Sequence, residues 1–465
     1  MNSSLQHDLQ HTDDLLQQVK DFSAAFLAGI DSLPVRKDQS SYSDISLPAD
    51  AQGAGHAFTQ FRERYEQQLA GNTNGRYWGF VTGGTTPAAI AGDWLTSALD
   101  MNAADKDGAA YQIEMDALKM LRELLGLPAE FFGCFTSGAT MSNFSGLAIA
   151  RQWLGIQHGI DVAQEGVAAL SNVKILSCVP HSSTVKSMAM LGLGRNALIQ
   201  LPALPDRESV DIAAVEQYLQ AHMGEPLIFV ASAGTVNTVD FDDIDALVAL
   251  KKQYGFYLHI DAAFGAFAAC HPDYKHLLKG WEWADSITVD AHKWLNVPYD
   301  AAMIFTRHQA IQMDVFKNVG AAYLGDPAKN FKFSNYTPEN SRRLRALPAW
   351  YSLMAYGAAG YADIIANNIT LSQLLGERIE QSEQFRLLAP VRLCGVCFTL
   401  KDPSGVDAFL AALTAGGKVL MTSTVYQGVP GIRAALVNWR TTPEDLDIAW
   451  EEMQTVYNTT GYEKV

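Results

Sequence analysis

Two residues, Asp261 and Lys293, have types and positions that could support catalysis. Each lies at the end of an apolar run that predicts a buried strand, in the strings LHIDAAFGAF and ITVDAHKWL. A lysine amine can form a Schiff base with the aldehyde of pyridoxal 5′-phosphate (PLP), and an aspartate can keep the pyridine nitrogen protonated so that the ring accepts electrons. The same pair could instead be a strand-end cap and a solvent-facing lysine, so these two residues alone leave both interpretations open.

Further stretches supply groups that a PLP ring and its phosphate require. The string GCFTSGATMSNF predicts a strand, a small-residue turn and a helix, where backbone N–H groups and the Thr140 hydroxyl could bind phosphate. His181 ends another apolar run, and a neutral imidazole can stack on the ring and transfer protons. Ala263 would leave room for a flat ring, and His292 places a polar group next to the lysine. Taken singly, each feature also fits an ordinary turn or cap.

The elements expected to position these residues form a mainly parallel sheet. From residue 133 to residue 307 the chain alternates helical patterns with short β-rich runs. The runs are almost continuously apolar, as expected for strands buried on both faces of a parallel sheet: VKILSCV, ALIQL, LIFVASA, FYLHIDA, SITVDA and AAMIFT. Sheets of this kind bind ligands at the carboxyl ends of their strands, which is where the residues above fall.

Helical and irregular segments surround this region. Apolar spacing predicts amphipathic helices over residues 12–30 and 113–127, and Pro87 is expected to begin a helix that runs to about Leu99. A long helix is expected over residues 341–369. Residues 318–340 show no clear period, and long irregular segments are often active-site loops.

These patterns predict three parts of the chain. Residues 1–88 are expected to form a helical segment, and residues 89–350 a large α/β domain that binds PLP. Residues 351–465 are expected to form a small α+β domain. Its final helix begins with TPED, which supplies an N-cap, a first-turn proline and acids suited to the helix dipole.

Composition limits the partners and the compartment. The net charge of −16 argues against general binding to nucleic acid or to anionic membranes, since both require a basic surface. The sequence contains no apolar run long enough to span a bilayer and begins with a polar, acidic stretch, so a cytoplasmic location is expected. Five scattered cysteines do not resemble a disulfide framework. Cys394 and Cys397 form a C-x-x-C, but within a strand they would face opposite sides, and we expect no metal site there.

Taken together, the motifs resemble the group II PLP-dependent amino-acid decarboxylases, which include aromatic amino-acid, glutamate, histidine and 2,4-diaminobutyrate decarboxylases. The resemblance runs from about Leu27 to Tyr457. It depends on DAAFG, DAHKWL, FTSGATMSN, the pairing of AGT with FDDI, and SRRLRALPAW. It implies PLP fold type I, the fold of aspartate aminotransferase, with an N-terminal helical arm and a small C-terminal domain. It also implies a homodimer with active sites at the interface, in which residues 1–88 take part in dimerisation.

The resemblance also implies residue roles. Lys293 corresponds to the Schiff-base lysine and Asp261 to the partner of the pyridinium nitrogen, while His181 would stack on the ring opposite Ala263. The positions on the phosphate side are Ala139, Thr140, Asp290 and His292.

Two positions depart from the family pattern. Thr235 matches the first threonine of a G-T-T string and is expected to contact the cofactor, but Val236 replaces the second threonine, which puts any polar contact from that position in doubt. The string FAAC also replaces a more usual glycine pair.

Tyr323 bears on the type of reaction. It matches the family's mobile-loop tyrosine, which reaches into the active site of the neighbouring subunit, and a phenol there could protonate Cα after CO2 leaves. The expected reaction is therefore conversion of an L-amino acid to its amine and CO2, through a Schiff base and a quinonoid carbanion, with Lys293, His181, Tyr323 and Asp261 as the catalytic residues.

Three further interpretations stay open on the sequence. One is oxidative aldehyde formation, although family members with that activity tend to carry phenylalanine at the position of Tyr323. Transamination on the same fold is the second, and a catalytically inactive PLP-binding paralogue is the third. The residues do not specify the substrate, although Asn102 and Ala104 fall near positions where aromatic-specific relatives place apolar contacts.

Overall fold

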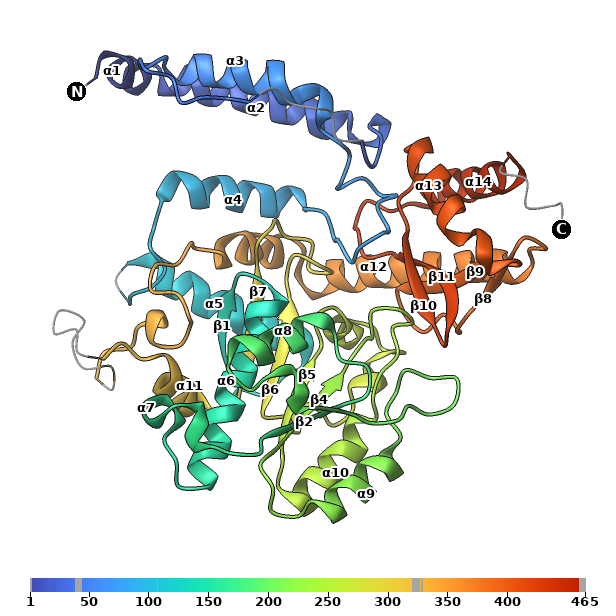
Figure 1. Ribbon diagram of the computed structural model, residues 1–465. Helices are drawn as coiled ribbons and strands as arrows, with labels where there is room; N and C mark the ends of the chain where they lie inside the picture. The colour runs from blue at the N-terminus through green and yellow to red at the C-terminus, as the bar shows by residue number, and fades with distance from the viewer. Residues whose placement is uncertain (1, 38–43, 107, 320–326, 328, 460–465) are drawn as a thin grey trace.

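The computed structural model describes residues 2–37, 44–106, 108–319, 327 and 329–459. A large body is built around one central sheet, a smaller sheet packs beside it, and a pair of long helices extends over the body (Figure 1). The helices that precede the central sheet are α1 (Ser3–Gln10), α2 (Thr12–Ala28), α3 (Ala54–Tyr65), α4 (Pro87–Leu99) and α5 (Ala109–Leu125).

The central sheet has seven strands in the order β1-β7-β6-β5-β4-β2-β3. The pairs β2–β3, β2–β4, β4–β5 and β5–β6 are parallel, and β7 runs antiparallel to both of its neighbours. The strands are β1 (Phe132–Thr136), β2 (Lys174–Ser177), β3 (Leu198–Gln200), β4 (Leu227–Ser232), β5 (Tyr257–Asp261), β6 (Ser286–Asp290) and β7 (Ala302–Thr306). The predicted mainly parallel sheet is therefore confirmed.

Helices cover both faces of this sheet, as the apolar runs predicted. On β4, Ile228 and Val230 face a cluster that contains residues of α6, while Phe229 and Ala231 face the cluster that contains residues of α9 and α10. Successive strand residues point to opposite faces, so an all-apolar strand requires cover on both sides. The connecting helices are α6 (Ala139–Gln157), α7 (Val162–Glu165), α8 (Ser182–Met190), α9 (Ile212–Ala221), α10 (Ile244–Tyr254) and α11 (Gln309–Phe316).

The second sheet is antiparallel and has the order β10-β11-β9-β8. Its core contains Phe385, Phe398 and Phe409, together with Leu375 from the last part of α12. The elements of this region are α12 (Ala346–Glu380), β8 (Phe385–Leu387), β9 (Gly395–Leu400), α13 (Val406–Gly416), β10 (Thr422–Tyr426), β11 (Val429–Ala435) and α14 (Pro443–Thr459). With the central sheet, this small α+β part completes the expected fold type I architecture.

The helix expected over residues 341–369 differs from the structure at both ends. It begins at Ala346 because Arg342 bonds to the 102–103 segment through its backbone: its carbonyl accepts from Ala103 N at 2.8 Å and its N–H donates to Asn102 Oδ1 at 2.9 Å. The helix continues to Glu380, and Gly357 breaks its regular geometry with φ of 57°. Glycine adopts this left-handed conformation without the steric cost that other residues incur.

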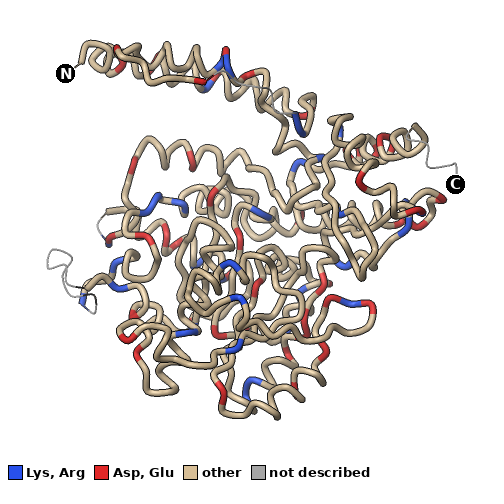
Figure 2. The backbone as a smooth tube through the Cα atoms, viewed as in Figure 1, with Lys and Arg blue, Asp and Glu red and all other residues tan. Residues whose placement is uncertain are grey.

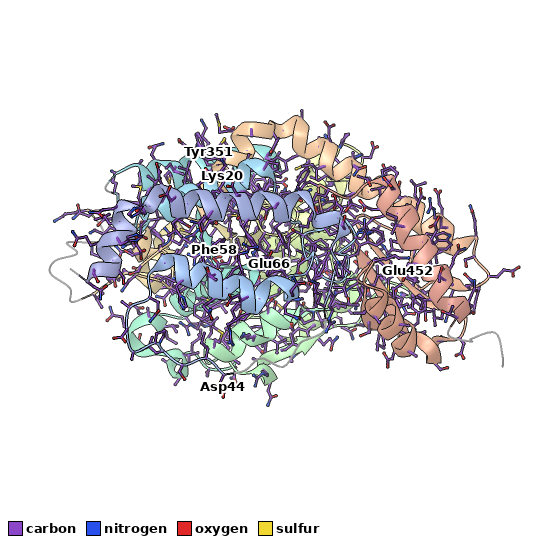
Figure 3. The ribbon with its side chains drawn as sticks, turned by 90° about the horizontal axis from the view of Figure 1, so that it is seen from above. Lys20, Asp44, Phe58, Glu66, Tyr351 and Glu452 are labelled. Atoms are coloured by element: carbon purple, nitrogen blue, oxygen red, sulfur yellow. The ribbon has the colours of Figure 1, made fainter. Side chains whose placement is uncertain are left out.

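The N-terminal helices α2 and α3 lie side by side, as the view from above shows (Figure 3). Phe22 of α2 meets Phe58 and Phe61 of α3 edge-on, with ring centroids 5.9 Å apart in each pair. None of the residues that form α2 or α3 is buried, although both helices carry apolar side chains. These helices therefore have an apolar surface that the rest of the described chain does not cover.

Charged side chains of both signs are interspersed over the described chain (Figure 2). The five cysteines are all free thiols. Cys394 lies just before β9 and Cys397 within it, so the two are not on one strand as expected, but they do belong to different hydrophobic clusters.

Candidate active site

The residues expected to bind the cofactor come together at the carboxyl edge of the central sheet. Two adjoining cavities share the lining residues Val81, Ala139, His181, Val236 and Lys293. The first is also lined by Asp261, Ala263 and Thr235, and the second by Thr140, Asp290 and His292. All nine cofactor-binding candidates therefore line one connected space. Tyr323, the tenth candidate, lies outside the described residues.

Asp261 is the last residue of β5, and its carboxylate is held by two donors. Asn143 Nδ2 donates to Oδ2 at 2.8 Å, and the backbone N–H of Ala263 donates to Oδ1 at 3.2 Å. Ala263 is buried directly after the strand, so its methyl group forms part of the wall beside the carboxylate. The carboxylate therefore enters the cavity with a fixed orientation.

Lys293 follows β6 in a short turn. Its Nζ lies 3.6 Å from Asp290 Oδ2 and 5.6 Å from the centre of the Phe264 ring. Both Lys293 and Asp261 line the first cavity, so the amine and the carboxylate face one enclosed space.

Asp290 ends β6 beneath the lysine and is almost completely buried. Burial raises the pKa of its carboxyl group, and the neighbouring Lys293 and His292 oppose that rise. Its Oδ1 lies 3.1 Å from His292 Nε2, and its Oδ2 accepts from the backbone N–H of Ala139 at 3.3 Å. Burial likewise lowers the pKa of His292. Asp290 therefore joins the lysine turn to the start of α6.

His181 immediately precedes α8, at the mouth of the space. Its surroundings lower the pKa of the imidazole chiefly by desolvation; Asp261 opposes this effect, and Lys293 and Arg433 reinforce it. A backbone N–H donates to the ring at Nδ1, from Ser183 at 3.2 Å. A neutral imidazole at this position can stack on a flat ligand and exchange protons.

The start of α6 meets the same space. Gly138 is its N-cap and offers no side-chain cap, and the Ala139 N–H donates to Asp290 Oδ2. Ser137, Gly138, Thr140 and Met141 line the larger cavity. Uncapped N–H groups at a helix start favour an anion through their hydrogen bonds and the helix dipole.

Thr235 lines the cavity, but its hydroxyl bonds elsewhere. It donates to Glu208 Oε2 at 2.5 Å and accepts from the backbone N–H of Asp240 at 2.9 Å. Glu208 also accepts from the Thr238 hydroxyl at 2.7 Å and from Asn237 Nδ2 at 3.0 Å. In this conformation Thr235 contributes its aliphatic surface to the cavity, while its hydroxyl helps to hold the loop that follows β4.

Sequence reasoning missed Arg433, which lies on β11 of the second sheet and lines the larger cavity. Its guanidinium donates to neutral oxygens: Val236 O at 3.0 Å, Thr422 Oγ1 at 3.3 Å and Gly79 O at 3.3 Å. Burial lowers its pKa, and none of the described carboxylates forms an ion pair with it. A lone arginine in the apolar run GIRAALV was the available signal.

Tyr299 was also missed. Its ring lies against the His292 ring with centroids 4.2 Å apart, and its hydroxyl lies 3.2 Å from the hydroxyl of Thr82. Both Tyr299 and Phe80 line the larger cavity, which gives it an aromatic rim.

The residues present fit PLP on chemical grounds. A carboxylate with a fixed orientation and an amine face one enclosed space, a buried alanine and an imidazole border it, and the start of α6 lies at its edge. These groups match the needs of an aldehyde, a pyridine nitrogen, a flat ring and a phosphate.

Comparisons with known proteins agree with this chemistry. The pyridoxal-dependent decarboxylase conserved domain matches residues 42–401. Aromatic-L-amino-acid decarboxylase of Drosophila lebanonensis is 27% identical over 388 residues, which cover 80% of this chain and 96% of that protein. Phenylacetaldehyde synthase of Petunia hybrida is 24% identical over 472 residues, covering 92% and 91% of the two chains.

The fold is also shared with solved structures. The crystal structure of Oryza sativa TDC with PLP and tryptamine superimposes with a TM-score of 0.90 at 20% identity, covering 97% of this chain and 98% of that one. Among the described helices, none is both long enough and apolar enough to cross a bilayer. Because the conserved domain spans most of its length, this chain belongs to the pyridoxal-dependent decarboxylase family and is a PLP-dependent carboxy-lyase that acts on an amino acid.

Proposed function

We propose that Lys293 carries PLP as a Schiff base, that Asp261 pairs with its pyridine nitrogen, and that the chain converts an L-amino acid to its amine and CO2. The observation that carries this proposal is that Asp261 and Lys293 line one cavity, which Ala263 and His181 also border. We further propose that the phosphate meets the α6 start, Thr140 and His292, which line the neighbouring pocket.

PLP supplies a conjugated, protonated ring that accepts the electron pair of the breaking Cα–carboxylate bond. Asp261 favours the protonated ring because its carboxylate is held in place by Asn143 and the Ala263 N–H. His181 and Ala263 restrict the ring to one plane. Asp290 Oδ2 lies 3.6 Å from Lys293 Nζ and balances the positive charge of the amine when the amine is protonated and not bound to PLP.

Arg433 is proposed to bind an anionic group of the substrate, such as its carboxylate. It is a largely buried cation with only neutral partners among the described residues, and it borders the larger cavity together with Lys293. A desolvated cation gains free energy when an anion arrives.

The proton that Cα needs is proposed to come from Tyr323 or from His181. A phenol or an imidazole over Cα can act as a general acid. His181 is the one of these two residues that the structure describes. It accepts a hydrogen bond at Nδ1, so its proton is available at Nε2. A proton placed on Cα would complete the amine product, and Lys293 would be the residue that displaces it from the cofactor.

We propose that the protein is a homodimer. Leu5, Leu9, Leu16 and Val19 are exposed at positions that recur with helical spacing along α1 and α2. Trp94, Leu95 and Leu99 are exposed on α4, below these helices in Figure 1. A second copy would cover these apolar faces, as large exposed patches usually require.

We also propose a cytoplasmic location for the protein, which its five free thiols favour.

The test is to supply the holoenzyme with a panel of L-amino acids and to identify products by mass spectrometry. We expect amine and CO2 in equal amounts, with neither keto acid nor peroxide. The Lys293→Ala variant should lose both turnover and the absorbance above roughly 400 nm that a lysine-bound PLP gives. Turnover by that variant would refute the mechanism. Keto acid formed by the wild type would indicate that the reaction is transamination and not decarboxylation.

A further inference from the structure

A buried chain of hydrogen bonds lies directly behind Asp261. Tyr257, His259 and Asp261 alternate along β5, so their side chains share the face of the sheet that α6 covers. Tyr257 and His259 are fully buried within this layer. A polar pair at such a depth must satisfy its hydrogen bonds within the protein.

The chain has a defined direction. The Tyr257 hydroxyl donates to Ser286 Oγ at 3.1 Å, and Ser286 Oγ lies 2.7 Å from His259 Nδ1. Burial lowers the pKa of His259 to about 4, so the ring is neutral at physiological pH. The Asp261 carboxylate can only accept, so Asn143 turns its NH2 group to Asp261 and its Oδ1 to His259 Nε2, which therefore carries the proton of the neutral ring. Nδ1 then accepts from the Ser286 hydroxyl. The Nε2 N–H donates to Asn143 Oδ1 at 2.9 Å.

Asp261 on one side and His259 on the other allow one orientation of the Asn143 amide. Its oxygen faces a donor, so its NH2 group faces the site, where it donates to Asp261 Oδ2 at 2.8 Å and to Ser183 Oγ at 3.1 Å. The reverse orientation would place the amide oxygen against a carboxylate and the NH2 group against the His259 N–H. Both contacts would then be repulsive.

The same amide reaches His181 through Ser183. The Ser183 hydroxyl accepts from Asn143 and lies 2.7 Å from His181 Nδ1, while the Ser183 backbone N–H donates to that nitrogen at 3.2 Å. His181 Nδ1 is therefore an acceptor, and the ring carries its proton on Nε2. One asparagine thus touches Asp261 directly and His181 through one hydroxyl.

Packing leaves Asn143 and His259 little freedom. Both are fully buried, and a Cβ placed on Gly146 of α6 would lie 2.4 Å from His259 Cε1. The helix lies so close to the strand that only glycine fits at this crossing. The pair is therefore held in one arrangement.

We propose that Asn143 is a positioning residue that couples the orientation of the Asp261 carboxylate to that of the His181 imidazole, and that His259 sets the orientation of the Asn143 amide. The inference rests on the proposed function, in which both groups contact the cofactor ring. PLP binding then depends on His259, which lies behind the site and does not touch the ligand.

The first measurement is the dissociation constant of PLP, obtained by titrating apoprotein and following fluorescence. Asn143→Leu and His259→Leu should each weaken PLP binding by about 10- to 100-fold, because each removes or misdirects a hydrogen bond to a charged group. His259→Gln keeps an N–H donor and should stay within about threefold of the wild type. The double variant Asn143→Leu/His259→Leu should bind PLP no more weakly than Asn143→Leu alone, since His259 acts through Asn143.

The second measurement separates two branches of the network: the bond from Asn143 to Asp261, and the bridge from Asn143 through Ser183 to His181. Ser183→Ala keeps the bond from Asn143 to Asp261 and removes the bridge to His181. PLP affinity should then stay within about threefold of the wild type, while kcat falls by about tenfold at an unchanged KM. A loss of PLP affinity equal to that of Asn143→Leu would refute the division into two branches.

Ser145→Ala is the matched control, since Ser145 is buried on the same helix and, among the described residues, its hydroxyl bonds only to the Met141 carbonyl at 2.8 Å. It should leave PLP affinity and kcat unchanged. Full additivity in the double variant, equal losses for His259→Gln and His259→Leu, or an unaltered PLP affinity in Asn143→Leu would each overturn the inference. Wild-type protein that fails to bind PLP would instead overturn the proposed function.

Discussion

A Cβ atom on Gly83 would lie 1.7 Å from the carbonyl oxygen of Lys293. The loop that contains Gly83 therefore lies directly against the backbone of the lysine turn. Thr86 in the same loop donates its N–H to Asn296 O at 2.9 Å, so the loop also contacts the chain three residues after Lys293. Residues distant in sequence thus set the position of the amine.

Gly83→Ala should displace the lysine turn, because the added methyl group meets backbone atoms that cannot rotate away. We expect the PLP absorbance above roughly 400 nm to be reduced and kcat to fall by at least about tenfold, as misplacement of a reacting group predicts. Gly55→Ala is the control, since an added Cβ there meets nothing within 4 Å. Normal PLP absorbance and turnover in Gly83→Ala would show that the lysine turn can adapt.

Replacing Arg433 should weaken substrate binding. Arg433→Met removes the buried cation while keeping the apolar stem, and KM should rise by about 10- to 100-fold, the range for a hydrogen bond to a charged group. The PLP absorbance should persist because Arg433 is not among the groups proposed to hold the cofactor. Arg378→Met, which removes only a surface pair with Asp447, should leave KM unchanged. An unaltered KM in Arg433→Met would mean that the anionic group binds elsewhere.

His259 should make the stability of the protein depend on pH. Burial lowers its pKa from 6.5 to about 4, and the charge of Asp261 only partly offsets this. Between pH 6.5 and 4 the unfolded chain binds more protons at this residue than the folded protein. The contribution of His259 to the free energy of unfolding is therefore complete above pH 6.5 and decreases as the pH falls, by about 3 kcal/mol in total.

The check is urea unfolding of the apoprotein at pH 7.5 and at pH 5, for the wild type and for His259→Gln. The wild type should lose about 2 kcal/mol more than the variant over this interval. The comparison cancels the opposite contribution of Asp242, whose pKa burial raises to about 6 and which is present in both proteins. Equal losses in the two proteins would mean that His259 accepts a proton in the folded state.

Tyr323→Phe tests the proposed proton donor. Without the phenol, amine formation should fall by about 10²- to 10⁴-fold, the usual contribution of a general acid. If O2 intercepts the unprotonated substrate, aldehyde, ammonia and hydrogen peroxide should appear with CO2. Product analysis under air and under nitrogen distinguishes these outcomes. Unchanged amine formation would assign the proton to His181.

Several elements of the protein follow directly from local sequence. The helix Pro87–Leu99 has the predicted bounds because a proline at its first turn and a hydroxyl cap at Thr86 act within a few residues. The strands that end at Asp261 and Asp290 were predicted from continuous apolar runs, which only a sheet covered on both faces can bury. The motifs at their ends were sufficient to predict the PLP fold and the family.

Only the tertiary structure decided which side chains meet. Arg433 reaches the cavity from the second sheet, and no local pattern in β11 indicates that contact. The Thr235 hydroxyl bonds to Glu208, and Asn143 connects His259, Asp261 and Ser183, because strand pairing and the close approach of α6 bring distant polar groups within hydrogen-bond distance. Sequence periodicity determines which face of an element is apolar. The partner of each buried polar atom is instead set by how the elements pack, since an unpaired donor or acceptor in the core costs more than its bond contributes.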